Sequence, residues 1–101
     1  MGGRFSELIE RQLDLFERED AEFLDRVEKA ERAYDRAERE DAEEAYGRFQ
    51  ELVEHGTEAL AEMREAYAAG LDPEAAEAYV AEFNAAVRRR LPRFALEIDD
   101  V

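Results

Sequence analysis

The 101-residue chain has no cysteine and no tryptophan, and it holds a single histidine and only two prolines. Without cysteine it cannot form a disulfide framework, a thiolate nucleophile or a thiolate metal site. No apolar run approaches the ~20 residues that a membrane-spanning helix needs. The N-terminal residues enter an amphipathic pattern directly rather than a secretory signal. We therefore expect a cytoplasmic protein that does not associate with membranes.

Positive charge is also scarce, because 28 acidic residues face 14 basic ones and the formal net charge is −14. Nucleic acids and anionic membranes are bound through clustered Lys and Arg side chains, so this balance argues against both partners. The basic cluster Arg88–Arg90 with Arg93 lies at the end of the last predicted helix, where it complements the helix dipole. We expect the acidic exterior to suit a basic protein surface, or to reflect a salt-adapted origin.

Apolar residues recur every seven positions along the first half of the chain. One row comprises Ile9, Phe16, Phe23, Ala30 and Ala37. A second row, four residues further on, comprises Leu13, Val27 and Tyr34, with Asp20 in the remaining position. Such spacing puts one apolar stripe along a long helix and is typical of the seam between packed helices, as in a coiled coil.

The pattern predicts an all-α fold. We expect a long antiparallel helical hairpin, formed by residues 6–39 and 41–69, with a third helix over residues 73–91 packed at its open end. The turn is placed near Glu40, because Asp41 and the Glu three residues later fit a capping box. A continuous helix through this region is the alternative.

The chain is predicted to be a single domain, 1–101, with a C-terminal tail over residues 92–101. Gly70 suits the end of the second helix, and Asp72-Pro73 suits a cap followed by the first helical residue. In the tail, Phe94, Leu96 and Ile98 alternate with other residues, a pattern that fits either an extended strand or a packed coil.

Little in the sequence suggests catalysis. Ser6 and Thr57 are the only serine and threonine, and no phosphate-binding or dinucleotide glycine pattern is present. We therefore expect no enzymatic activity and no cofactor. The alternative is a carboxylate-ligated metal-dependent hydrolase or a metal-binding helical bundle. Its ligands would be Glu51, His55 and Glu58, which lie on successive turns and could share one face.

Interaction residues are easier to nominate. Leu8, Leu15 and Leu24 lie off the main stripe and need cover from the third helix or from a second chain. Tyr34 and Tyr46, near the predicted tip, could fill the seam or contact a partner. We expect a non-enzymatic interaction or assembly module that forms a homodimer through helix packing.

A single acid interrupts the apolar stripe. Asp20 lies between Leu13 and Val27 on the seam, and in a hairpin that turns near residue 40 it would lie opposite Arg64. We predict that Asp20 and Arg64 pair and fix the register of the two helices.

Overall fold

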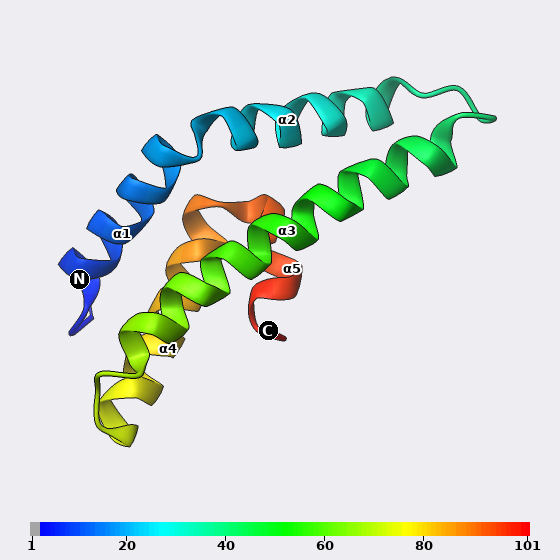
Figure 1. Cartoon of the computed structure of the whole chain (residues 1–101). Helices are drawn as coiled ribbons and strands as arrows, with labels where there is room; N and C mark the ends of the chain where they lie inside the picture. The colour runs from blue at the N-terminus through cyan, green and yellow to red at the C-terminus, as the bar shows by residue number, and fades with distance from the viewer. Residues whose placement is uncertain (1–2) are drawn as a thin grey trace.

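The computed structural model describes residues 3–101, and within that range it contains five α-helices, one 3₁₀ turn and no β-strand. This confirms the all-α prediction (Figure 1). The elements are α1 (Ser6–Glu19), α2 (Ala21–Arg36), α3 (Ala42–Ala68), α4 (Pro73–Arg90), η1 (Pro92–Phe94) and α5 (Ala95–Ile98).

The chain doubles back between Arg36 and Ala42, so the hairpin forms and the continuous-helix alternative is wrong. α2 and the first half of α3 make a slender projection at one end of the molecule (Figure 1). The molecule measures 50 × 24 × 24 Å, and its radius of gyration is 15.2 Å. A compact chain of this length would have a radius of gyration of about 13 Å, so the fold is elongated.

The predicted first helix is not continuous: it divides at Asp20, whose φ and ψ of −107° and 24° leave the helical region. Figure 1 shows the bend between α1 and α2. α2 packs on α3, whereas α1 packs on α4, and one straight helix cannot lie along both. The Asp20 side chain makes no capping hydrogen bond, so the break follows from the packing of α1 and α2 on different neighbours. α2 then ends at Arg36 rather than residue 39.

In the C-terminal third of the chain the predicted third helix is confirmed, but the predicted conformation of the tail is wrong. The Asp72 carboxylate accepts a hydrogen bond from the Ala75 amide at 2.9 Å, and Pro73 is the first helical residue of α4. The tail is neither a strand nor a coil, because residues 92–98 form η1 and α5. Phe94 and Ile98 insert into the core from these two turns.

The core lies where α1, α4 and the tail meet the second half of α3. Its largest fully buried residues are Tyr79, Phe83, Phe94, Ile9, Leu13, Leu60 and Ile98. Gly56 admits the Phe94 ring against α3: a Cβ atom at this position would lie 2.4 Å from Cε1 of Phe94. The heptad rows therefore predict which side of each helix is buried, and the tail supplies side chains that fill the base.

The arginines at the end of α4 form ion pairs that hold the helices together. Arg90 pairs with Glu10, Asp14 and Glu17 of α1, with an Nη2–Oδ1 distance of 2.6 Å to Asp14. The hydrogen bond to Asp14 raises the pKa of Arg90 above its ordinary value. Two further pairs, Arg88–Asp99 and Arg93–Glu31, tie α4 to the tail and η1 to α2.

Candidate interaction surface

A shallow apolar face lies between α1 and the second half of α3, and we call it the α1–α3 face. It is formed by Leu8, Gln12 and Leu15 of α1 and by Ala59, Met63 and Tyr67 of α3. Leu15 is 41% exposed and Tyr67 is 38% exposed, although both are large apolar side chains. In Figure 1, α4 is visible between α1 and α3. α1 and α3 each pack on α4, and the exposure of Leu15 and Tyr67 shows that no other part of the described chain covers them fully.

Tyr79 of α4 forms the floor of the face and joins its two sides. The Tyr79 hydroxyl donates a hydrogen bond to Oε1 of Gln12 at 2.8 Å, and its ring lies 4.8 Å from the Tyr67 ring. Tyr79 is fully buried. Burial raises the pKa of its phenol, and the hydrogen bond with Gln12 partly opposes that rise. The floor is therefore rigid and neutral, as the base of a helix-packing surface should be.

The α1–α3 face opens at one end into a cavity of about 710 Å³. The cavity is lined by residues 3–8 together with Arg11 and Tyr67. At the other end of the face, the Phe23 ring of α2 contacts the His55 ring of α3 in a tilted arrangement, with centroids 5.3 Å apart. Ala59 and Met63 follow His55 at four-residue intervals and lie on the same side of α3.

Beside the face, α1 carries charges of both signs: the exposed acids Glu7 and Asp14 directly precede Leu8 and Leu15, and three arginines lie near them. Arg4, Arg11 and Arg18 follow one another at seven-residue intervals along α1 and its N-terminal approach, and all three are exposed. Within residues 3–101 none of them forms an ion pair. We call these residues the arginine row.

The second half of α3, the turn after it and the first half of α4 are acidic. From residue 51 to residue 82 the chain has nine carboxylates and one Arg or Lys, Arg64, which is buried. Glu58 and Glu62 of α3 are exposed. The seven-residue spacing of the arginines on α1 was a readable signal in the sequence.

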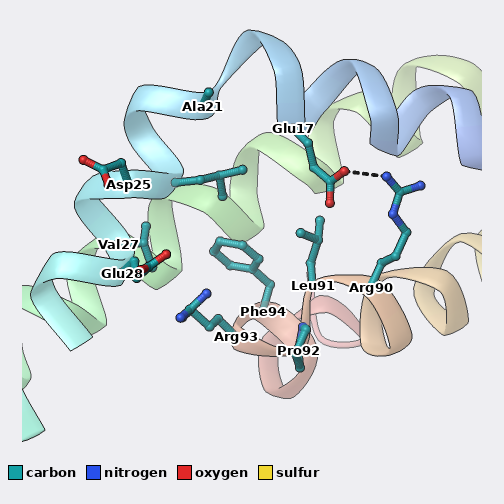
Figure 2. Close-up of a pocket in the computed structure, with 11 residues that line it drawn as sticks. Glu17, Ala21, Asp25, Val27, Glu28, Arg90, Leu91, Pro92, Arg93 and Phe94 are labelled. Carbon is teal, nitrogen blue, oxygen red and sulfur yellow. Dashed lines mark hydrogen bonds and ion pairs between the residues drawn. The ribbon is translucent and has the colours of Figure 1, made fainter. Parts of the chain in front are cut away.

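A second hollow lies between α2, the end of α4 and η1, and we call it the α2–η1 pocket (Figure 2). Its volume is about 440 Å³, and its apolar lining comes from Leu24, Val27, Leu91 and Phe94. Figure 2 shows Phe94 and Leu91 on one side and Glu17 paired with Arg90 on the rim. The two arginines of the rim, Arg90 and Arg93, are already paired with carboxylates. The pocket is large enough for a small apolar group, but its positive charges are neutralised.

The lining of the α2–η1 pocket shows that the prediction of one shared leucine surface is wrong. Leu8, Leu15 and Leu24 were expected to share one exposed surface, but Leu24 lines the α2–η1 pocket, whereas Leu8 lines the cavity beside Tyr67. The break at Asp20 separates them, because a residue beyond the bend no longer continues the surface of α1. Only Leu8 and Leu15 belong to the α1–α3 face.

The two tyrosines near the tip contact each other. The rings of Tyr34 and Tyr46 lie 5.2 Å apart, and they are 39% and 47% exposed. They contact each other across the seam between α2 and α3, which is one of the two roles that the sequence suggested. Contact with a partner stays a prediction.

The predicted register pair does not form. Arg64 donates to Oδ1 of Asn84 at 2.8 Å, to the carbonyl oxygen of Ile98 at 3.0 Å and to that of Val101. Arg64 is 2% exposed, and Asp20 lies instead at the bend between α1 and α2. Arg64 therefore fixes the C-terminal turns against α3 and α4.

The candidate metal ligands do not form a site. Glu51, His55 and Glu58 are all exposed, and His55 packs its ring on Phe23. Across residues 3–101, no group of three or more His, Cys, Asp or Glu side chains has a geometry that could hold a metal ion.

None of the helices in the described part of the chain is both long and apolar enough to cross a bilayer. Comparison with protein-family models, curated proteins and solved structures finds no match to this chain.

Proposed function

We propose that this protein is a non-enzymatic assembly module that associates with a second copy of itself through the α1–α3 face. The observation that carries the proposal is the exposure of Leu15 and Tyr67, on opposite sides of a face whose floor is fully buried. Exposed aromatic and aliphatic side chains over a rigid base are typical of the central residues of an interface.

The arrangement of the helices leaves the α1–α3 face available for packing against another helix. α1 and α3 both pack on α4, and the Phe23–His55 contact lies at one end of the face between α1 and α3. Helical layers bury their apolar stripes against further helices. A helix laid on this face would cover Leu8, Leu15, Met63 and Tyr67 together.

The charges on the face favour a second copy as the occupant. Each copy has a net charge of −14, so two copies repel one another unless positive side chains are placed at the contact. The arginine row lies near Leu8 and Leu15 on α1, and within the described residues none of its members forms an ion pair, so it can offset part of that repulsion.

Leu15→Glu tests the proposal, with Leu96→Glu as the matched control. Leu96 is 92% exposed on α5, so its replacement adds the same charge away from the face. We expect sedimentation equilibrium to give a dimer for the wild type and for Leu96→Glu. Leu15→Glu should weaken dimerisation at least about tenfold, because a carboxylate would be buried in the contact. A monomeric wild type, or equal weakening by both substitutions, would refute the proposal.

A further inference from the structure

The tail, residues 92–101, lies against α3 and α4 in the way that a bound peptide lies in a groove. η1 and α5 both pack on α3 and on α4. Phe94 and Ile98 are 1% and 0% exposed, whereas Leu96 between them is 92% exposed. Two buried anchors four residues apart, with a solvent-facing residue between them, are typical of a short amphipathic helix that occupies a groove. We call the surface beneath the tail the α3–α4 groove.

The α3–α4 groove has a notch for the aromatic anchor. Gly56 of α3 is buried, and a Cβ atom added to it would lie 2.8 Å from Cζ of Phe94. Glycine lets the ring approach the backbone of α3 more closely than any residue with a side chain would. The groove is therefore shaped for an aromatic side chain at the first anchor position.

The groove also has a polar site for the end of a helix. Arg64 is 2% exposed, and it donates to the carbonyl oxygen of Ile98 at 3.0 Å and to that of Val101. Asn84 and Glu65 are its other acceptors. The last carbonyl groups of a helix have no partner within the helix, and a buried guanidinium that lacks acceptors is costly. Arg64 thus favours an occupant whose helix ends here over one that is merely apolar.

The tail has a short connection and weak contacts outside the groove. One residue, Leu91, joins α4 to η1, and its φ and ψ of −129° and 63° lie outside the helical region. The ion pairs Arg88–Asp99 and Arg93–Glu31 are partly exposed, and such pairs contribute little. A tail from another copy would therefore make nearly all the contacts that hold this one. Exchange of identical elements is a low-cost route to association, and a short connection favours it.

We propose that the α3–α4 groove binds the tail of a second copy when the molecule's own tail leaves it. The molecule's own tail is the competitor, because a short linker gives it an effective concentration on the order of millimolar. A separate tail therefore binds the wild type weakly and binds well once the resident tail is weakened. The α3–α4 groove is distinct from the α1–α3 face, so this inference does not depend on the proposed function.

A synthetic peptide with the sequence of residues 91–101 tests the groove. The peptide carries a fluorescent label at its N-terminus, and its anisotropy is measured as protein is added. We expect it to bind the Phe94→Ala chain at least about tenfold more tightly than the wild type, because the resident tail has lost an anchor. Equal affinity for the two proteins would overturn the proposal.

Two altered peptides are the matched controls. The peptide with Phe94→Ala should bind at least about tenfold more weakly, because it cannot fill the notch beside Gly56. The peptide with Leu96→Ala should stay within about threefold of the unaltered peptide, because Leu96 faces solvent. Indiscriminate apolar binding would weaken both peptides alike, which contradicts a shaped groove.

The folding of the Phe94→Ala chain provides a second readout. If this chain is partly unfolded on its own, the unaltered peptide should restore its helical circular dichroism, and the peptide with Phe94→Ala should not. Ile98→Ala removes the other anchor and should accept the peptide in the same way. Failure of the peptide both to bind and to restore either chain would refute the proposal.

Exchange between whole chains is tested in the Leu15→Glu background, which disables the α1–α3 face. Gly56→Leu blocks the groove and frees an intact tail, whereas Phe94→Ala opens the groove. We expect sedimentation equilibrium to show more dimer in the mixture than in either chain alone. A mixture of Phe94→Ala with Gly56→Leu/Phe94→Ala has no intact tail and should stay at the level of the separate chains. Equal dimer fractions in the two mixtures would overturn tail exchange and leave the α1–α3 proposal unaffected.

Discussion

The two ends of this molecule use the same heptad spacing but differ in how many neighbours each helix has. At the base, α1, α4, η1, α5 and the second half of α3 surround Tyr79, Phe83 and Phe94, which are fully buried. At the tip, the last turns of α2 and the first turns of α3 pack on each other (Figure 1). There the seam consists of small residues and the half-exposed pair Tyr34 and Tyr46. The spacing predicts which side of a helix is apolar, and the number of neighbouring elements determines how deeply it is buried.

The largest loss of stability should come from removing a large buried side chain from the core at the base. Phe94→Ala removes a ring that is 1% exposed and packs against Gly56 of α3. We expect the free energy of unfolding to fall by about 3–5 kcal/mol, because the substitution loses buried apolar area and leaves a cavity. Urea unfolding followed by circular dichroism measures this change.

Tyr46→Ala is the comparison at the tip. Its ring is half exposed and contacts one other ring, so we expect a loss below about 1 kcal/mol. Equal losses in the two variants would show that the tip carries as much of the packing energy as the base.

The same substitution at two glycines of α3 should have opposite signs at the two ends. Gly56→Ala places a methyl group where Phe94 and Phe23 already lie, the nearest atom being 2.4 Å away. We expect a loss of about 2 kcal/mol from overpacking. Gly47, near the tip, has no atom within 4 Å of an added Cβ. Gly47→Ala should therefore stabilise the protein by about 0.5–1 kcal/mol through helix propensity alone.

Thermal and urea unfolding of the two alanine variants gives the comparison directly. A stabilised Gly56→Ala protein would mean that the tail does not pack on α3 as described. In that case Phe94 would have to leave the core without a measurable cost.

The helices were predictable from the sequence because their signals are local. The heptad rows mark the buried sides, and the cap at Asp72 with Pro73 places the start of α4 within one residue. The break at Asp20 was not predictable in this way, because it depends on α1 packing on α4 while α2 packs on α3. Neither glycine nor proline marks it.

The candidate surface was predictable only in part, for the same reason. Leu8 and Leu15 were correctly placed off the main stripe, but their separation from Leu24 follows from the bend. Arg64 was assigned to Asp20 by counting along a two-helix hairpin. That count along two helices left out the tail, whose carbonyl oxygens accept hydrogen bonds from Arg64. A contact with a distant segment that has no pattern of its own leaves no signal in local spacing.

The smallest predicted effect concerns the floor of the α1–α3 face and depends on pH. Tyr79→Phe loses the hydrogen bond to Gln12, and we expect a loss of about 1 kcal/mol near neutral pH. Burial raises the pKa of Tyr79 above its ordinary value of 10.0. The stability that comes from keeping this phenol neutral is complete below about pH 10, and it is lost as the pH rises through the folded-state pKa. Urea unfolding across the alkaline range should therefore show a steeper loss of stability for the wild type than for Tyr79→Phe. The control, Tyr46→Phe at the exposed tip, should follow the wild-type profile. If Tyr79→Phe loses stability as steeply as the wild type above pH 10, the phenol is reached by water and the floor of the face is not the rigid, dry surface that a docking helix requires.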